Sequence, residues 1–278
     1  MADPLGLEEV RRALAEDRVD ADVTTCLFGR AAERPARARF VAEGRFVVAG
    51  LPIAALVFGE LTPRAALTPL VGDGAWTEAG AAIANVAAPA RSLLAGERVA
   101  LNFLQRLSGI ATQTRRAVDA VAGTGCRITH TRKTTPGLRA LECYAVRVGG
   151  GVSNRASLAD AVMWKDNHWA LLDARGANLA DVLRAVPPDL PVVVEIETER
   201  QLEESLQAGA PHLLVDNQPP ECVAAWVRRA GPAVTIQASG GITPDTARAY
   251  AEAGARLLAI GALTHSVAAA PLRCDISW

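Results

Sequence analysis

Only two of the 29 basic residues in this chain of 278 residues are lysines, Lys133 and Lys165. An ammonium group is a compact charge whose pKa shifts readily on burial, a property that arginine does not offer. Both lysines stand inside dense polar stretches of the sequence. We therefore expect both amines to take part in chemistry. The alternative is that two lysines simply survived a general preference for arginine.

Basic and acidic residues in the second half of the chain suggest two sides of one site. Carboxylates at Glu195, Glu197 and Asp216 suit Mg²⁺, sugar hydroxyls or a developing cation. An opposing basic wall, suited to an anionic substrate, is predicted from Arg132, Lys133, Arg139, Arg155 and Lys165. Together the walls predict transfer of a sugar phosphate to a carboxylated acceptor through an oxocarbenium-like state. Structural ion pairs without a ligand are the alternative.

Two glycine-containing segments are typical of phosphate binding. Ser239-Gly240-Gly241 opens a predicted helix, and residues 261–266 follow the last predicted strand. Glycine lets backbone N–H groups approach a phosphate, and a helix N-terminus adds the positive end of its dipole. His168 and His265 adjoin polar stretches, so we expect both to contact ligand. The histidines show no metal-ligand spacing.

The polar stretches follow an alternation of short apolar runs and amphipathic helical segments. Helices are predicted over 199–208 and 220–230, and from a cap at Thr243 toward residue 253. Because strand C-termini of a parallel βα barrel meet on one face, the polar stretches would line a single pocket. An open doubly wound sheet is the alternative. The predicted strands cover residues 127–131, 161–165, 192–197, 212–215, 234–238 and 257–260.

The first hundred residues predict a separate α+β domain. A long helix over 90–107 is expected to break at Ser108-Gly109 before a second helix over 112–121. Strands are expected over 37–48, 66–71 and 81–87. We predict an N-terminal domain over residues 1–110 and a barrel domain over 111–266, with the tail 267–278 packing back on the N-terminal domain.

Composition excludes several classes of protein. A formal net charge of −1 gives no field that would draw the chain onto nucleic acid or an anionic membrane. The longest apolar run, residues 46–59, contains Pro52 and is shorter than the roughly 20 residues that span a bilayer. The N-terminus has no apolar secretory core, so we expect the cytoplasm. Five widely spaced cysteines predict neither a disulfide framework nor structural zinc.

Several motifs together resemble the quinolinate phosphoribosyltransferase family, the nicotinate-nucleotide pyrophosphorylases of NAD biosynthesis. DVTT at Asp22 and DIS at Asp275 extend the resemblance over nearly the whole chain. TRKTTPG and KDNH are highly specific. The motifs are ERVALN from Glu97 with the following LSGIAT, TRKTTPGLRALE from Thr131, YAVRVGGG from Tyr144, KDNH from Lys165, SGGIT from Ser239 and GALTHS from Gly261.

The resemblance implies an α/β protein with an N-terminal α+β sandwich domain and a C-terminal, incomplete TIM-like α/β barrel. It implies transfer of the ribosyl phosphate of PRPP to the ring nitrogen of quinolinate, a pyridine dicarboxylate, with Mg²⁺ as cofactor. Pyrophosphate and CO₂ leave, and nicotinate mononucleotide forms. Homodimers are also implied, in which each active site takes an arginine from the neighbouring subunit; higher assembly is left open.

Site roles are carried over by position. Arg98 matches the arginine donated across the dimer. We take Lys133, Lys165, Glu195 and Asp216 as catalytic, with Glu195 and Asp216 as Mg²⁺ ligands. The remaining substrate-binding candidates are Arg132, Arg139, Asn154, Arg155, His168, Ser239, Gly240, Gly241, Gly261 and His265.

Three positions depart from the family pattern. Asn154 stands where the family usually has His, Cys143 where it has Lys, and His130 where it has Asp. A hydrogen bond to an ionised partner is worth about 1.5–3 kcal/mol, so these changes would alter affinity for a dianion about tenfold or more. A paralogue acting on another carboxylated heteroaromatic acceptor is therefore the main alternative. A Schiff-base lyase at Lys165 and a silent nucleotide-binding protein are the others.

Overall fold

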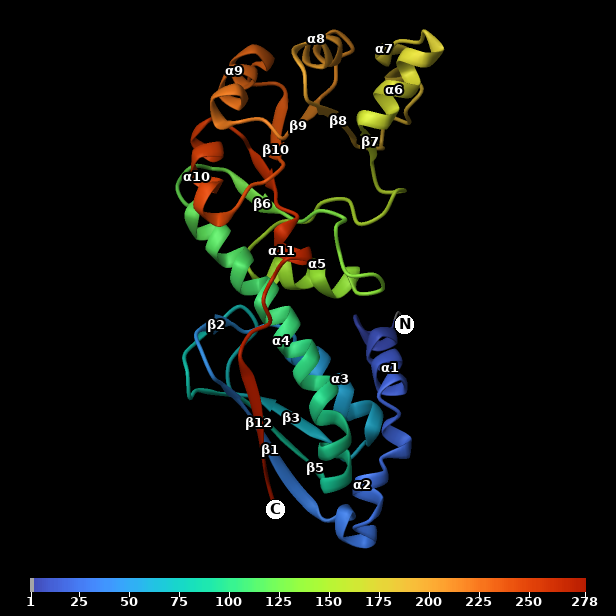
Figure 1. Ribbon diagram of the computed structural model, residues 1–278, viewed down its shortest axis with the longest axis vertical. Coiled ribbons are helices and arrows are strands. Elements are labelled where there is room, and N and C mark those ends of the chain that lie inside the picture. The colour runs from blue at the N-terminus through green and yellow to red at the C-terminus, as the bar shows by residue number, and fades with distance from the viewer. Residues whose placement is uncertain (1–2) are drawn as a thin grey trace. The chain divides into compact units, whose positions relative to one another are not determined.

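The computed structural model describes residues 3–278, whose contacts separate into two compact units. The first unit contains residues 3–115, 135–150 and 266–278, and the second contains residues 116–134 and 151–265. Residues 135–150, which the sequence suggested for the barrel, thus belong to the first unit by their contacts. Figure 1 traces the elements along the chain.

An antiparallel sheet in the order β12-β1-β5-β3 forms the base of the first unit. Along β1, Ala38 and Phe40 are buried while Arg37 and Arg39 are exposed, because successive side chains of a strand point to opposite faces. The strand expected over 37–48 is two strands, and the second pairs in a separate ladder with β4. The strands are β1 (Pro35–Ala42), β2 (Phe46–Val47), β3 (Ala66–Pro69), β4 (Trp76–Thr77), β5 (Ala82–Pro89) and β12 (Leu272–Ser277).

Helices complete the core of this unit. Phe58 of α3 and Phe40 of β1 are both fully buried and lie 6.2 Å apart between ring centroids. Asp73 accepts hydrogen bonds from the backbone N–H groups of Gly50 and Leu51, which satisfies two donors at the start of α3. The helices are α1 (Leu7–Glu16), α2 (Val23–Cys26), α3 (Leu51–Leu61), α4 (Ala90–Ala120) and α5 (Arg139–Val148).

The predicted break at Ser108-Gly109 is wrong, because α4 continues unbroken from Ala90 to Ala120. Ser108 is fully buried, and its hydroxyl bonds to both the N–H and the carbonyl of Ala49. A Cβ added at Gly109 would lie 2.2 Å from the carbonyl oxygen of Ala268. The glycine therefore permits a close approach of the chain rather than ending the helix.

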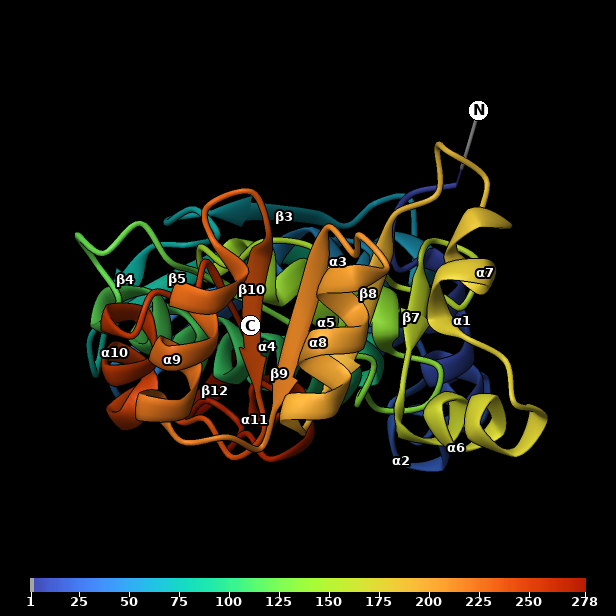
Figure 2. The same ribbon diagram turned by 90° about the horizontal axis from the view of Figure 1, so that it is seen from above.

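Six parallel strands in the order β6-β11-β10-β9-β8-β7 form the second unit, and Figure 2 shows β10, β9, β8 and β7 side by side. In the part of the chain that is described, β6 and β7 do not pair with each other, so the barrel is incomplete, as predicted. The strands are β6 (Arg127–Thr129), β7 (Val162–Trp164), β8 (Val192–Ile196), β9 (His212–Asp216), β10 (Thr235–Ser239) and β11 (Leu257–Ala259).

Three of the helices that follow these strands, α8, α9 and α10, lie where periodicity and capping residues predicted them. Thr243 accepts from the N–H of Thr246 and caps α10, whose first residue is Pro244. Gly209 and Gly254 follow the ends of two helices with positive φ, as predicted for helix stops. The helices are α6 (Asp166–Arg175), α7 (Leu179–Arg184), α8 (Glu199–Gln207), α9 (Pro220–Ala230), α10 (Pro244–Glu252) and α11 (Ala262–His265).

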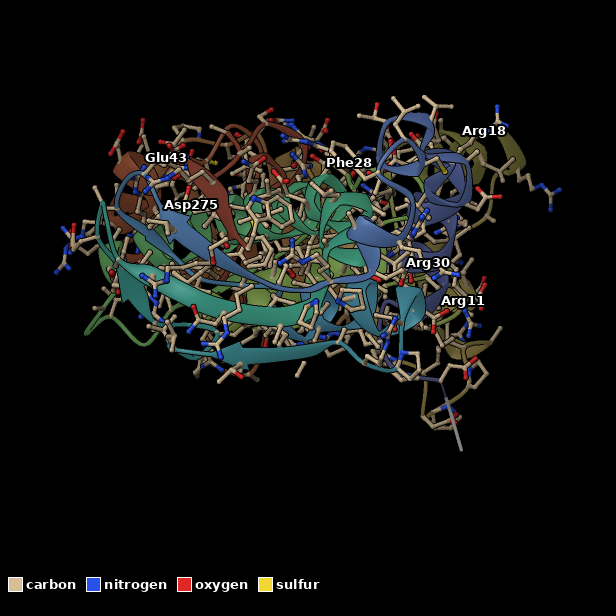
Figure 3. The ribbon with its side chains drawn as sticks, turned by 90° about the horizontal axis from the view of Figure 1, so that it is seen from below. Arg11, Arg18, Phe28, Arg30, Glu43 and Asp275 are labelled. Carbon is tan, nitrogen blue, oxygen red and sulfur yellow. The ribbon has the colours of Figure 1, made fainter. Side chains whose placement is uncertain are left out.

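The outer surface of the first unit carries many charged side chains, and Figure 3 labels Arg11, Arg18, Arg30, Glu43 and Asp275 among them. Arg273 of β12 links two of these, since it lies 3.7 Å from Glu43 and 3.1 Å from Asp275. Phe28 is the labelled exception and is 61% exposed. Among residues 3–278, no helix combines the length and the apolar character needed to cross a membrane.

Candidate active site

The alternation of side chains along the parallel strands places polar groups in one cavity. Glu195, Asp216 and Ser239 face it from β8, β9 and β10, while the neighbouring residues Ile196 and Val215 are fully buried. The volume of about 320 Å³ is within the usual range for a small-molecule site. The cavity is lined by Thr131, Arg132, Lys133, Asn154, Arg155, Met163, Lys165, Glu195, Leu214, Asp216, Ser239 and Ala259.

Lys165 and Glu195, which both line this cavity, form an ion pair. The Glu195 side chain is only 8% exposed, whereas that of Lys165 is 41% exposed. Burial raises the pKa of the Glu195 carboxyl, and the hydrogen bond and charge of Lys165 oppose that rise. The carboxylate is therefore held in a poorly hydrated position beside a cation that can still meet a ligand.

Two residues of α6 orient this pair. His168 accepts a hydrogen bond at Nδ1 from the backbone N–H of Lys165, over 2.9 Å. Trp169, which is buried, donates from Nε1 to the backbone carbonyl of Glu195, also over 2.9 Å. The KDNH motif and the tryptophan after it thus fix the backbone of both charged residues.

Asp216 is connected to the Ser239-Gly240-Gly241 turn through Asn217. The Asn217 side chain donates to Oδ2 of Asp216 over 2.7 Å, and its backbone N–H donates to the carbonyl of Ser239 over 3.0 Å. A Cβ at Gly240 would lie 2.1 Å from Oδ1 of Asn217. Asn217 itself has a φ of 52°, a left-handed conformation that few non-glycine residues adopt. Asp216 and the glycine turn are therefore held together by Asn217.

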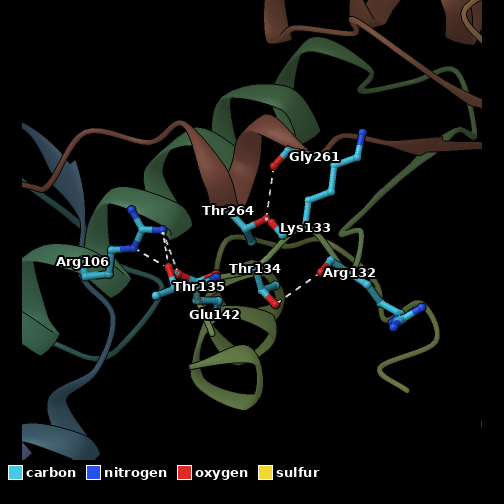
Figure 4. Close-up of polar contacts among 8 residues, drawn as sticks. All are labelled: Arg106, Arg132, Lys133, Thr134, Thr135, Glu142, Gly261 and Thr264. Carbon is cyan, nitrogen blue, oxygen red and sulfur yellow. Dashed lines mark hydrogen bonds and ion pairs between the residues drawn. The ribbon is translucent and has the colours of Figure 1, made fainter. Parts of the chain in front are cut away.

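The loop after β6 carries Lys133 and is fixed by α11 (Figure 4). Thr264 donates its hydroxyl to the carbonyl oxygen of Lys133 over 2.7 Å, and the same hydroxyl lies 3.1 Å from the carbonyl oxygen of Gly261. A Cβ at Gly261 would lie 3.1 Å from both Cδ of Lys133 and Nε2 of His265. Gly261 and His265 are thus adjacent to Lys133. Within residues 3–278, the Lys133 ammonium forms no ion pair.

Arg132 and Arg155 bring two guanidinium groups to the same cavity. Burial and the nearby charge of Arg132 both lower the pKa of Arg155. The Nε of Arg132 is buried and has no hydrogen-bond partner in the described part of the chain. A buried donor without an acceptor costs free energy, and an anionic ligand would supply the missing acceptor.

Arg98 and Arg139 belong to the first unit. Arg98 lines a cavity of about 420 Å³ there, together with Arg12, Asn102 and Arg106. Arg139 begins α5. Neither residue is among those that line the cavity of the second unit.

A buried carboxylate of the first unit fixes the far end of the TRKTTPG segment (Figure 4). Glu142 is fully buried and accepts from Arg106 over 2.7 Å and from both the N–H and the hydroxyl of Thr135. Such a carboxylate needs these donors, because burying an unpaired charge is costly. Thr135 is only two residues beyond Lys133.

Sequence reasoning placed eight of its candidates in this cavity, namely Arg132, Lys133, Asn154, Arg155, Lys165, Glu195, Asp216 and Ser239. Gly240, Gly261 and His265 pack next to these residues, and Gly241 follows in the turn. Glu197 is exposed and does not line the cavity. Sequence reasoning missed Thr264, Asn217 and Glu142, although each stands inside a polar motif, because their side chains bond to other groups of the protein rather than line the cavity.

A parallel strand-end pocket with a basic wall, an acidic wall and a glycine turn defines an enzyme of α/β-barrel type that handles a phosphorylated, anionic substrate. Residues 110–275 match the C-terminal domain, and residues 21–108 the N-terminal domain, of quinolinate phosphoribosyl transferase. The chain belongs to this family.

The similarity to individual relatives extends over almost the whole length of this chain. The chain is 41% identical over 284 residues to the nicotinate-nucleotide pyrophosphorylase [carboxylating] of Mycobacterium leprae, covering 97% of this chain and 96% of that protein. A probable nicotinate-nucleotide pyrophosphorylase of Bacillus subtilis is 39% identical, covering 94% and 90%. Among solved structures, the nicotinate-nucleotide pyrophosphorylase of Ehrlichia chaffeensis superposes with a TM-score of 0.91 at 32% identity, with all of both chains covered.

Proposed function

We propose that this chain transfers the ribosyl phosphate of PRPP to the ring nitrogen of quinolinate, with release of pyrophosphate and CO₂, in de novo NAD biosynthesis. The observation that carries the proposal is the single cavity in which Arg132, Lys133 and Arg155 face Glu195 and Asp216. Membership of the family gives the reaction its substrates.

The basic side of the cavity suits the dicarboxylate. Guanidinium groups bind carboxylates in a bidentate manner, and the unpaired Nε of Arg132 supports such a role. Lys133 adds an ammonium group that forms no ion pair among residues 3–278. These contacts would hold the ring with its nitrogen toward the ribose.

The acidic side suits the developing charge on the sugar. As the C1–O bond breaks, pyrophosphate leaves with the electron pair and the ribose becomes oxocarbenium-like, which the carboxylates of Glu195 and Asp216 would stabilise. The ring nitrogen then bonds to C1. The positive ring accommodates the electron pair left on C2 when CO₂ departs, and this carbon takes a proton. Lys133 is our candidate for assisting that last step.

The donor set also fits Mg²⁺ bound together with the substrate. No group of three or more His, Cys, Asp or Glu side chains able to hold a metal occurs within residues 3–278. Glu195 and Asp216 offer two carboxylates, and Mg²⁺ commonly takes one or two from the protein and the rest from phosphates and water. The ion would neutralise the charge of the diphosphate. Glu195 and Asp216 would hold it.

For the assembly, we propose a homodimer in which Arg98 reaches the site of the neighbouring subunit, and a cytoplasmic location. Arg98 is exposed and lines the first unit's cavity, which supports this role. Arg139 would assist in binding the acceptor.

The test is incubation of the purified protein with PRPP, Mg²⁺ and quinolinate, followed by mass spectrometry of nicotinate mononucleotide and CO₂. Other pyridine carboxylates are run in parallel, because Asn154 and His130 differ from the family pattern and favour the paralogue as the second candidate. If no product forms with quinolinate but pyrophosphate is released with another acid, the paralogue replaces our proposal.

A further inference from the structure

Two of the residues that depart from the family pattern, His130 and Asn154, are hydrogen-bonded to each other. The backbone N–H of Asn154 donates to Nε2 of His130 over 3.1 Å, and Nδ2 of Asn154 donates to the backbone carbonyl of His130, also over 3.1 Å. Since these two residues lie 24 positions apart in the chain, their contact joins two separate segments. We call this pair of hydrogen bonds the 130–154 clasp.

The clasp continues the edge of the sheet by means of side chains. Before it, Val152 donates its backbone N–H to the carbonyl of Ile128 over 2.8 Å, and Thr129 forms an isolated parallel bridge with Val152. At the next position, the imidazole and the amide replace the regular backbone ladder. His130 is only 1% exposed, so its ring is fixed by the interior of the protein.

Each partner of the clasp precedes a cationic residue of the cavity. His130 precedes the segment with Arg132 and Lys133, and its Nδ1 lies 3.4 Å from the carbonyl oxygen of Thr131. Asn154 precedes Arg155, whose backbone N–H donates to Oδ1 of Asn154 over 2.8 Å. The Asn154 amide therefore uses both its oxygen and its nitrogen on the protein.

Resting on the function proposed above, we infer that His130 and Asn154 are positioning residues, which hold Arg132 and Arg155 toward the carboxylates of the acceptor. The Asn154 amide does not itself bind the acceptor. The two guanidinium groups repel each other when no anion lies between them, so their backbone needs a rigid anchor. A neutral clasp supplies that anchor without adding a further cation.

Kinetics at saturating PRPP test this inference. His130→Leu removes the ring nitrogen that accepts from Asn154, and we expect the KM for quinolinate to rise about three- to tenfold while kcat changes less. His130→Gln can place Oε1 near the same N–H and should restore most of the loss. His212→Gln, which changes a histidine outside the cavity-lining residues, is the matched control. An unchanged KM in His130→Leu, or equal losses in both His130 variants, would overturn the inference.

A double-mutant cycle tests whether the two residues act as one unit. If they do, His130→Leu combined with Asn154→Ala will have a kcat/KM within about twofold of the worse single variant, because the loss of either hydrogen bond already releases the two segments. Losses that multiply would mean that the two hydrogen bonds act independently, which contradicts the inference of a single clasp.

A third measurement does not depend on the reaction. In ¹⁵N-histidine-labelled protein without ligand, the signal that disappears in His130→Gln should report a neutral ring protonated at Nδ1, since Nε2 accepts a hydrogen bond. Protonation at Nε2 would refute the clasp. If wild-type protein gives no turnover with quinolinate, the proposed function fails, while the tautomer still decides whether the clasp exists.

Discussion

The hydroxyl of Thr264, on the short helix after the last strand of the parallel sheet, donates to the carbonyl oxygen of Lys133, which follows the first strand. Because β11 and β6 are neighbours in the sheet, this bond joins adjacent strand ends. The Thr264 side chain is completely buried, so water cannot replace it. The position of the Lys133 backbone therefore depends on a residue that has no acid, base or charge.

Thr264→Val should impair catalysis more than stability explains. The change leaves the Lys133 carbonyl without its donor, at a cost of about 1–3 kcal/mol, and releases the loop that carries the ammonium. We expect kcat/KM to fall about tenfold, whereas Thr264→Ser should stay near wild type. Steady-state kinetics with urea denaturation measure both effects, and Thr235→Val on β10 serves as control. Equal kcat/KM values for the Val and Ser variants would contradict this role.

Glu195 should make stability depend on pH in a defined direction. Burial raises its pKa in the folded chain above the ordinary value of 4.5, so the folded state binds this proton more tightly than the unfolded state. The resulting contribution to stability is present below the ordinary pKa and is lost as pH rises through the raised one. Relative to wild type, Glu195→Gln should therefore gain in free energy of unfolding between about pH 4 and about pH 7.

Urea denaturation at both pH values checks the prediction for Glu195. The exposed Glu221→Gln is the comparison variant. A difference between Glu195→Gln and wild type that stays constant across this range would show that the folded-state pKa is not raised.

Gly240 and Gly241 should respond differently to alanine. Both have positive φ, but a Cβ at Gly240 meets Asn217 at 2.1 Å, whereas a Cβ at Gly241 meets nothing within 4 Å. Gly241→Ala should cost only about 1 kcal/mol of backbone strain. Gly240→Ala should displace the Asp216-Asn217 turn and raise the KM for PRPP by at least about tenfold. Kinetics on the pair measure this, and similar KM values in the two variants would count against the packing described.

Two helical glycines offer a second matched comparison. Gly109→Ala places a methyl group 2.2 Å from the carbonyl oxygen of Ala268, and we expect a loss of at least about 1–3 kcal/mol in the free energy of unfolding. Gly59 lies exposed in α3 with nothing within 4 Å of its added Cβ, so Gly59→Ala should gain about 0.5–1 kcal/mol. Thermal or urea unfolding would reveal the opposite signs, and a neutral Gly109→Ala would mean that the approach of residue 268 is adjustable.

Residue patterns predicted the second unit, which contains the parallel sheet, better than the first unit, for a physical reason. Its strands are short apolar runs with polar ends, as in β8, where Val194 and Ile196 are buried and Glu195 faces the cavity. That pattern also predicted which charged residues would meet. Gly109 misled us, because a glycine that permits close packing and one that ends a helix look the same in a sequence.

Other features depend on contacts that no local pattern contains. In the sequence, Glu142 looks like an ordinary helical residue. In the structure it is fully buried and forms an ion pair with Arg106, which lies 36 positions away. Likewise, Asn154 was predicted to bind substrate, and its bonds to His130 became visible only in three dimensions. Side chains that serve backbone groups have no characteristic spacing, so the sequence could not distinguish them from ligand contacts.

The pairing of β12 with β1 has a consequence for how the chain folds. Arg37 and Ser277 are register partners although they lie 240 positions apart. The whole second unit stands between them in the sequence. During synthesis, one edge of β1 stays unpaired until β12 has left the ribosome. Long-range pairing of this kind slows folding, and an unpaired edge invites association with other chains. We therefore expect the second unit to fold first on the ribosome, and β12 to complete the antiparallel sheet afterwards by pairing with β1.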